Sequence, residues 1–240
     1  MKECKISQVV RKILPSKYCG AVIVAAGSAS RMGGIDKVMA ELRGEPMIVH
    51  TVRAFENCAL IREIIIVTRE DLILPITGLC SGFSKVKAVV AGGQSRQESV
   101  NLGMNALSSQ VKLVAVQDGA RPLVSNAVID RTVRAAAEFG AAVPGIPVKD
   151  TIKTFRGGLV GETPDRAGLR AIQTPQVFDL DLLRGALKRA EETGAQITDD
   201  SSAVELMGMS VKVVEGDERN IKVTTPMDLH IAKLLLEEMK

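Results

Sequence analysis

AVIVAAGSASRMGGIDK, residues 21–37, is the stretch from which the fold can first be predicted. Its opening residues, Ala21–Ala26, form a short apolar run with the length and β-branched content of a buried strand. A loop of small residues follows, and small side chains let peptide N–H groups come close to phosphate oxygens. Arg31 and Lys37 add two positive charges beside this loop. The pattern is typical of a strand followed by a phosphate-binding loop, although an ordinary glycine turn with two solvated cations has much the same sequence.

Two common phosphate-binding motifs do not fit this loop. The dinucleotide fingerprint G-x-G-x-x-G fails because Ala29 and Met32 occupy the later glycine positions after Gly27, which disfavours an NAD-dependent dehydrogenase. The P-loop fails because Gly34 is not followed directly by Lys37. The remaining pattern, A-A-G-x-x-x-R-M-G and then Lys, resembles the signature of nucleotidyltransferases that join an NTP to a sugar or alditol phosphate.

Length and composition restrict the class of protein. A chain of 240 residues can bury a substantial core, and 46% hydrophobic with 25% charged residues is ordinary for a globular protein. Aromatic residues are scarce at 2% and the net charge is only +3, so we expect no nucleic-acid partner. No apolar run approaches the ~18 residues of a membrane span, and no signal peptide is recognisable, so we expect a cytoplasmic protein without a membrane partner.

The four cysteines fit neither a C-x-x-C pair nor a zinc spacing. Cys19 and Cys58 stand beside apolar runs, which favours buried free thiols in a reduced compartment. His50 and His230 lie in helical patterns far apart in sequence, which indicates neither a catalytic triad nor a metal cluster.

Strand and helix patterns alternate from residue 20 onward, which favours an α/β fold with a Rossmann-like, doubly wound, mostly parallel sheet. The predicted strands are Ala21–Ala26, Glu63–Thr68, Lys87–Ala91, Lys112–Gln117, Ala141–Ile146, Ser210–Val214 and Asn220–Val223. The predicted helices are Pro46–Asn57, Ser95–Leu107, Ser125–Phe139, Asp179–Glu192, Asp199–Met207 and one from Pro226 onward. Pro46 suits a first helical position and Ser125 an N-cap, while Asp71–Ser81 stays ambiguous because Pro75 and Gly78 interrupt a helix.

Three parts of the chain are distinguished. Residues 1–18 form a basic leader with apolar residues at helical spacing, and residues 19–240 are expected to be a single domain. Within that domain, residues 147–177 have β-branched alternation and a Gly157–Gly158 turn, which predicts a projecting β-hairpin arm. An arm that cannot bury both faces alone packs most simply on a second copy of the chain, so we expect a homodimer.

Polar residues follow the predicted strands, where the carboxyl ends of a parallel sheet bind ligands. Gly93 and Ser99 follow one strand, where the glycine can bring the backbone up to a base and the serine offers a hydroxyl at a helix start, although an ordinary glycine and N-cap junction accounts for these residues equally well. Asp118 follows another and is well placed to hold Mg²⁺ against a triphosphate, the alternative being an Asp that pairs with Arg121 and rigidifies the turn. Lys222 lies in an otherwise apolar segment, where its ammonium is costly unless it reaches an anion.

Taken in order, these motifs resemble the family of 2-C-methyl-D-erythritol 4-phosphate cytidylyltransferases, enzymes of the non-mevalonate isoprenoid pathway. The matching motifs run from residue 20 almost to the end and are A-A-G-S-A-S-R-M-G…D-K, G-G-Q-S-R-Q-E-S-V, V-Q-D-G-A-R-P, P-V-K-D-T-I-K, D-R-x-G-L, Q-T-P-Q-x-F and V-E-G-D-E-R-N-I-K-V-T-T-P-x-D-L. The chain departs from the family pattern at Ala29, Asp36 and Val38, where Gly, Pro and Gln are common.

The resemblance implies transfer of CMP from CTP to methylerythritol 4-phosphate, with Mg²⁺ as cofactor and no covalent intermediate. The residues that it implies fall into four groups. The catalytic group is Arg31, Lys37 and Lys222, and the nucleotide-binding group is Ala25, Ala26, Gly27, Gly93, Ser99 and Gly119. The substrate-binding group is Arg121, Thr151, Arg166 and Lys222, and the metal ligand is Asp118; Gly119 is also implied to line the methylerythritol phosphate site. Thr151 and Arg166 lie on the arm and are implied to act in the partner's site.

Two other functions are compatible with some of the same residues. A sister cytidylyltransferase that uses ribitol 5-phosphate shares the fold and the reaction, but Lys149, Asp150, Thr151 and the D-R-x-G-L stretch favour methylerythritol phosphate. A non-catalytic nucleotide-binding module would be expected to lack some of Arg31, Lys37, Asp118 and Lys222, and all of them are present.

Overall fold

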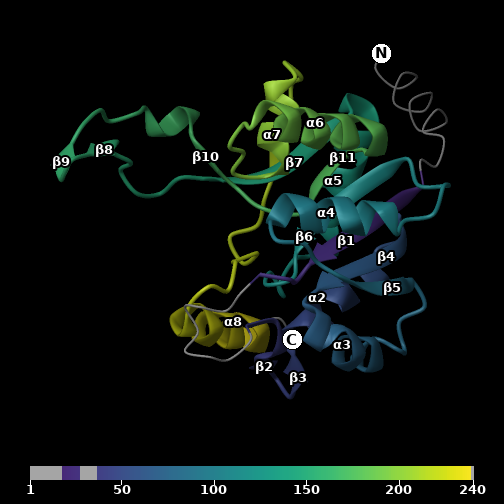
Figure 1. Ribbon diagram of the computed structural model, residues 1–240. Coiled ribbons are helices and arrows are strands. Elements are labelled where there is room, and N and C mark those ends of the chain that lie inside the picture. The colour runs from purple at the N-terminus through teal and green to yellow at the C-terminus, as the bar shows by residue number, and fades with distance from the viewer. Residues whose placement is uncertain (1–17, 28–36, 239–240) are drawn as a thin grey trace, which may run out of the picture.

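The computed structural model describes residues 18–27 and 37–238, and its elements are labelled in Figure 1. The strands of the main sheet are β1 (Cys19–Val24), β4 (Ile61–Thr68), β5 (Val86–Ala91), β6 (Leu113–Asp118), β7 (Ala141–Pro147), β10 (Arg170–Ile172), β11 (Gln176–Asp179) and β12 (Lys212–Glu215). The helices are α2 (Met47–Glu56), α3 (Ile73–Leu79), α4 (Arg96–Asn105), α5 (Asn126–Phe139), α6 (Leu180–Thr193), α7 (Asp200–Leu206) and α8 (Pro226–Glu238). Short elements are the strands β2 (Glu41–Leu42), β3 (Glu45–Pro46), β8 (Phe155–Arg156) and β9 (Leu159–Val160), and the 3₁₀ helices η1 (Lys37–Met39), η2 (Glu70–Leu72) and η3 (Arg166–Gly168).

The main sheet has the strand order β10–β7–β11–β6–β1–β4–β5, and β12 also pairs with β7. Pairing is parallel between β1 and its neighbours β4 and β6, between β4 and β5, and between β7 and β12. Strand β11 is antiparallel to both β6 and β7, and β10 is antiparallel to β7. The predicted α/β fold with a mostly parallel sheet is therefore confirmed.

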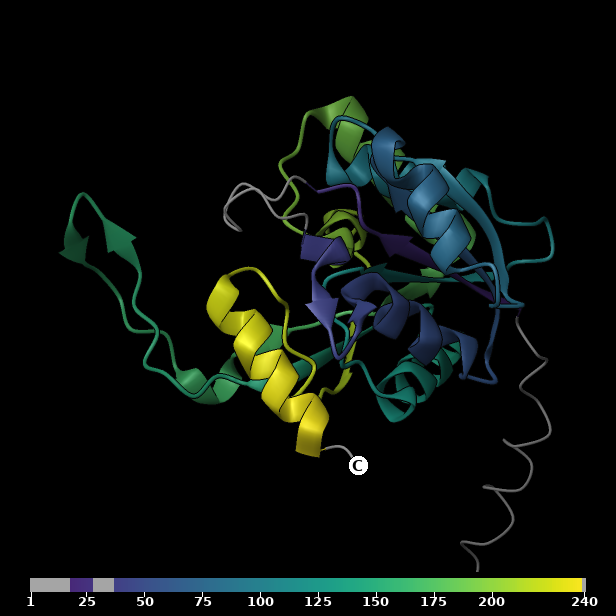
Figure 2. The same ribbon diagram turned by 90° about the horizontal axis from the view of Figure 1, so that it is seen from below.

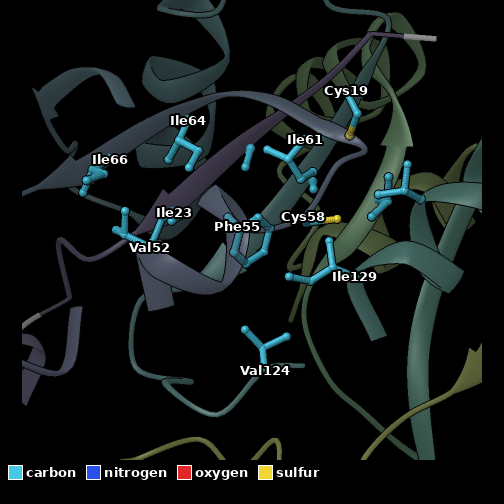
Figure 3. Packing of buried hydrophobic residues seen from close by; sticks show 14 of the residues in the cluster. Cys19, Ile23, Val52, Phe55, Cys58, Ile61, Ile64, Ile66, Val124 and Ile129 are labelled. Carbon is cyan, nitrogen blue, oxygen red and sulfur yellow. The ribbon is translucent and has the colours of Figure 1, made fainter. Parts of the chain in front are cut away.

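Side chains alternate along β1 and so build a separate core on each face of the sheet. Ile23 points to the face covered by α2, α3 and α5, where it lies in one cluster with Phe55 and Ile129 (Figure 3). Val22 points to the opposite face, where α4, α6 and α7 supply residues such as Val100 and Leu183. Since helices cover both faces, the central strands are buried throughout and read as continuous apolar runs.

A third, smaller core joins α8 to the hairpin of β2 and β3. Leu42, Met47, Val223 and Ala232 are all buried in this cluster. Figure 2 shows α8 beside this hairpin, on the side of the molecule from which the arm extends. The C-terminal helix thereby fixes the end of the segment that carries Lys222.

The predicted arm is present, with different bounds. Strands β8 and β9 form a hairpin that projects from the body, and Gly157 and Gly158, both with positive φ, make its turn (Figure 1). The prediction that the arm continues to residue 177 is wrong, because Arg170–Ile172 pairs with β7 and Gln176–Asp179 enters the sheet between β6 and β7. The arm therefore consists of the residues between β7 and β10.

Two other local predictions need correction. Asn220–Val223 is not a strand. Its side chains anchor the segment to its neighbours, and its backbone makes one hydrogen bond like those between strands, from Val223 N to Ala120 O at 2.8 Å. The helix α2 begins at Met47, so Pro46 precedes it instead of opening it. The ambiguous segment, Asp71–Ser81, forms η2 and α3. Pro75 falls in the first turn of α3, where backbone N–H groups have no partner within the helix, so the missing N–H of proline costs no helical hydrogen bond.

Two smaller predictions are confirmed, the N-cap at Ser125 and the burial of the free thiols of Cys19 and Cys58. Ser125 caps α5 by accepting a hydrogen bond from Val128 N. Cys19, Cys58 and Cys80 are buried free thiols, and burial raises the pKa of Cys80 to about 11. Among the described residues, no helix has the length and apolar character needed to cross a bilayer. The leader lies outside the described residues except for Tyr18, and the division into a leader and one domain stays a prediction.

The contact between α4 and the sheet generates a stability prediction. A Cβ added at Gly103 would lie 2.4 Å from Val22 Cγ1 and 2.7 Å from Val67 Cγ2, which are atoms of the two central strands. Gly103→Ala is therefore expected to lower the free energy of unfolding by about 1–3 kcal/mol through overpacking.

Gly185→Ala is the matched control, because Gly185 is also helical but has no atom within 4 Å of its added Cβ. This variant is expected to gain up to about 1 kcal/mol from helix propensity. Urea unfolding measures both effects, and a Gly103→Ala protein as stable as the parent would contradict the close packing of α4 on the sheet.

Candidate active site

A cavity of about 390 Å³ opens at the carboxyl ends of β1 and β6. Its walls come from the loop after β1, from η1, from the loop between β5 and α4, from the loop after β6 and from the segment before α8. The described residues that line it are Val24, Ala25, Ala26, Gly27, Lys37, Val38, Gly93, Gln94, Ser95, Arg96, Ser99, Asp118, Gly119, Ala120 and Lys222. The cavity lies where the topology of a doubly wound sheet places ligands.

Backbone hydrogen bonds fix the floor of the cavity. Ala25 N donates to Val67 O at 2.7 Å, and Gly119 N donates to Val24 O at 2.8 Å, so the loops after β1 and β6 continue the parallel ladder. The hydroxyl of Thr51 in α2 donates to Gly119 O at 2.9 Å. The ammonium of Lys37 lies close to Gly27 on this floor: its Nζ is 3.9 Å from the position that a Cβ added to Gly27 would occupy.

The loop between β5 and α4 forms the second wall. Ser95 caps α4 by accepting from Glu98 N, and Glu98 in turn accepts from Gln94 N at 2.7 Å. The hydroxyl of Ser99 accepts from Gly93 N at 3.1 Å and donates to Ser95 O at 2.9 Å. Ser99 therefore holds the loop in shape at the cavity wall, whatever else its hydroxyl contacts there.

Asp118 lies at the centre of a cluster of cations, although it is only 8% exposed. Lys222 Nζ is 2.9 Å from Asp118 Oδ2, Arg121 Nε is 3.4 Å from the same oxygen, and Arg96 Nη2 is 3.8 Å from Oδ1. Burial by itself raises the pKa of this carboxyl, but Lys222, Arg96 and Arg121 outweigh it and hold the pKa of Asp118 below its usual range. Asp118 is therefore an anion at neutral pH, and Lys222 has the anionic partner that its sequence context demands.

Arg121 is not among the residues that line the cavity, although it contacts Asp118, which does. Its Nη1 donates to Asn220 O at 2.7 Å, while its Nε faces Asp118. The pairing of Asp118 with Arg121, which is the structural alternative to a metal ligand, is thus present. A substrate-binding role for Arg121 stays a prediction.

A network of buried amides places Lys222 at the cavity. Gln173 donates to Asp217 O at 2.8 Å and accepts from Asp217 N at 3.1 Å, which fixes the start of the segment. Asn220 is fully buried, and its Nδ2 donates to Thr174 O at 2.8 Å. The side chains of this segment attach it to the loop before β11, so that Lys222 enters the cavity from a fixed backbone.

The predicted site residues fall into four groups, of which Arg121, behind Asp118, is one by itself. Most of them line the one cavity: Ala25, Ala26, Gly27, Lys37, Gly93, Ser99, Asp118, Gly119 and Lys222. Arg31 lies outside the described residues. Thr151 and Arg166 are exposed on the arm and do not line this cavity; Arg166 Nη1 donates to Lys149 O at 2.6 Å.

Arg96 is a cavity residue that the sequence analysis missed. It is the first residue of α4, and its guanidinium faces Asp118 on one side and Asp200 on the other, 2.8 Å from Asp200 Oδ2. The signal was present in the loop G-G-Q-S-R, where a cation opens a helix beside glycines. Asp200 had no such signal, because it stands among ordinary polar residues of a helix start.

The acidic groups of the site are few. Asp118 is the one carboxylate among the described lining residues, against the cations of Lys37, Arg96 and Lys222. The described residues contain no group of three or more His, Cys, Asp or Glu side chains that could hold a metal ion by themselves. The arrangement suits an anionic ligand that brings oxygen atoms of its own.

The close approach of Gly92 to the floor of the cavity generates a prediction. A Cβ added at Gly92 would lie 2.4 Å from Ala26 Cβ and 2.9 Å from Ser99 Oγ, so Gly92→Ala must push the two walls apart. We expect weaker CTP binding in calorimetry and a loss of about 1–3 kcal/mol of stability. Gly82→Ala, on an exposed turn with no atom within 4 Å, is the control and should change neither. Unchanged CTP affinity in Gly92→Ala would mean that the spacing of these walls does not matter for the nucleotide.

The comparisons with known proteins agree with this geometry. The family model described as 2-C-methyl-D-erythritol 4-phosphate cytidylyltransferase matches residues 19–238. A protein of that name from Caldanaerobacter subterraneus is 43% identical over 91% of this chain and 98% of its own length, and one from Symbiobacterium thermophilum is 45% identical over 90% and 92%. The crystal structure of 4-diphosphocytidyl-2C-methyl-D-erythritol synthase from Anaerococcus prevotii superposes with a TM-score of 0.84 at 32% identity, covering 93% of this chain and 98% of that one. The chain therefore belongs to the 2-C-methyl-D-erythritol 4-phosphate cytidylyltransferase family of nucleotidyltransferases.

Proposed function

We propose that this protein transfers CMP from CTP to 2-C-methyl-D-erythritol 4-phosphate, giving 4-diphosphocytidyl-2-C-methyl-D-erythritol and pyrophosphate. The observation that carries the proposal is the cavity at the carboxyl ends of β1 and β6, where Lys37, Arg96 and Lys222 converge from three separate segments. CTP and the acceptor phosphate carry several negative charges, whereas the described residues that line the cavity carry one carboxylate and three cations. The cations can therefore bind the phosphate groups of both ligands.

In the proposed reaction the bond that forms joins a phosphate oxygen of the acceptor to the α-phosphorus of CTP. The bond that breaks joins the α-phosphorus to the oxygen bridging to the β-phosphate, and pyrophosphate leaves with that electron pair. A phosphate monoester is already a competent nucleophile, so the protein's part is to align the two ligands and stabilise charge. Lys37 and Arg31 hold the phosphates of CTP, and Lys222 orients the acceptor phosphate.

Asp118 is the residue through which a Mg²⁺ ion would be held. Mg²⁺ commonly binds proteins through one or two carboxylates while substrate phosphates and water complete its shell, and a single lining carboxylate fits that mode. The bound ion would supply charge neutralisation to the triphosphate. Lys222 contacts the same carboxylate at 2.9 Å, so Asp118 also keeps the ammonium of Lys222 at the cavity.

The arm belongs to the proposal as the element that completes a partner's site. Phe155, Leu159 and Val160 of the arm are 75%, 75% and 68% exposed, which is a large apolar surface for two short strands without a core. Thr151 and Arg166 lie on this arm and do not line the cavity of their own chain. We therefore assign them to the acceptor site of the second subunit in a homodimer.

Pyrophosphate release tests the activity. The protein is incubated with CTP and Mg²⁺, with methylerythritol 4-phosphate and ribitol 5-phosphate offered in parallel, and a third mixture omits Mg²⁺. We expect release with methylerythritol 4-phosphate alone and none without the metal. Release only with ribitol 5-phosphate would keep the mechanism and refute the acceptor, while silence with both from a protein that binds CTP would refute catalysis.

Removal of the phosphate-binding cations tests the mechanism. Lys37→Ala and Arg31→Ala are each expected to fold normally and to lose about 10²–10³ in turnover, the usual cost of removing one preorganised donor. Lys188→Ala, an exposed lysine of α6, is the control and should keep full activity. If both variants keep turnover within about threefold of the parent, Lys37 and Arg31 do not have the proposed phosphate-binding role.

Mixing two inactive variants tests the arm. A Lys37→Ala subunit has a defective cavity but an intact arm, and an Arg166→Ala subunit has the reverse. In a mixed dimer one complete site is restored, so random exchange should recover about a quarter of the parent activity. No recovery from dimers shown to have exchanged would place Arg166 in its own chain's site, and an Arg166→Ala protein that is active before mixing would place Arg166 outside catalysis.

A further inference from the structure

Asp200 is a fully buried carboxylate behind the wall of the cavity, and the proposed mechanism does not use it. It is the first residue of α7, and its carboxylate forms an ion pair with Arg96, whose Nη1 lies 2.8 Å from Asp200 Oδ2. Its carboxyl oxygens make no hydrogen bond of good geometry to another described residue. A buried carboxylate is costly unless paired, so this residue depends on the guanidinium of Arg96.

The position of Asp200 is fixed from the sheet. Asp199 caps α7 by accepting from Ser202 N at 2.9 Å, and Gln176 of β11 holds this helix start from both sides. Gln176 Nε2 donates to Asp199 Oδ2 at 2.7 Å, and Gln176 Oε1 accepts from Ser201 N at 3.0 Å. Gln176 pairs with Val116 of β6, the strand that ends in Asp118. The two carboxylates that flank Arg96 are thus held by neighbouring strands.

Arg96 lies between two cavities. Its side chain is 32% exposed and lines the main cavity, but it also lines a second cavity of about 370 Å³ that reaches to Ala195 and Thr198. A long side chain with open space on both sides has many rotamers to lose on binding a ligand. The ion pair with Asp200 removes that freedom before a ligand arrives.

We propose that Asp200 is a positioning residue of the nucleotide site, which holds the guanidinium of Arg96 at the cavity wall where it donates hydrogen bonds to bound CTP. This proposal rests on the proposed function for the identity of the ligand. Nη1 of the guanidinium pairs with Asp200, while Nη2 lies 3.8 Å from Asp118 Oδ1 and Arg96 itself lines the cavity, which leaves further N–H donors for a ligand there.

The test compares two carboxylates that each hold local structure, one behind the cavity wall and one away from the cavity. Asp200→Asn removes the charge that holds Arg96, whereas Glu56→Gln removes an equal charge that accepts hydrogen bonds from Ser84 N and Lys85 N and does not line the cavity. Both variants are expected to lower the melting temperature. Only Asp200→Asn is expected to raise the KM for CTP and its calorimetric Kd, by about tenfold, the effect of losing one charged hydrogen bond. The KM for the acceptor should stay unchanged.

A double-mutant cycle separates positioning from general damage. Because Asp200 acts through Arg96, the CTP affinity of Arg96→Ala combined with Asp200→Asn should equal that of Arg96→Ala alone within about twofold. Additive losses would overturn the proposal, and so would Asp200→Asn with parent affinity for CTP. If Asp200→Asn does not fold, the CTP affinity of Arg96→Lys is measured instead. The lysine still pairs with Asp200 but lacks the planar, forked donor geometry of a guanidinium. A CTP affinity equal to that of the parent in this variant would refute the proposal.

The two levels of inference fail differently. If the parent protein binds CTP but releases no pyrophosphate, the proposed function fails while the CTP binding cycle still measures the role of Asp200. If the parent turns over normally and the cycle shows no coupling, the proposed function stands and the positioning role is refuted.

Discussion

A carboxylate buried at the end of β6 is the constraint on which this site depends. Asp118 is only 8% exposed, and a buried charge is tolerated in a protein when cations or hydrogen bonds compensate it. Its partners come from the start of α4, from the turn after β6 and from the segment before α8. Since each cation must reach the same carboxyl group, three connections that are far apart in sequence are brought to one edge of the sheet.

The same constraint preorganises the cavity. Arg96 and Lys222 are long side chains, and both are held by carboxylates that the fold fixes, so part of their rotamer entropy is lost on folding and not on binding. Preorganised charges stabilise a developing charge without having to move. The carboxylates that hold these two cations also lower the net positive charge of the cavity.

The sequence predicted the parts of this structure that local chemistry decides. The apolar run at Ala21–Ala26 and the later strand runs predicted the parallel sheet, and the loops after them predicted most of the cavity lining. Prediction failed where tertiary context decides. Asn220–Val223 reads as a strand by its β-branched residues, yet its buried side chains anchor a loop. Arg96 reads as an ordinary cation of a helix start, and only the fold brings it between two carboxylates.

The central position of β11 has a consequence for the order in which the chain can be assembled during synthesis. Strand β6 is buried along its whole length, yet its second neighbour is β11, which follows the entire arm. A nascent chain that ends before Gln176 can pair β6 with β1 but leaves the other edge of β6 without a partner. An unpaired apolar edge is a template for association with other chains. While the arm is being translated, β6 therefore presents one unpaired edge, and the synthesis of β11 closes it.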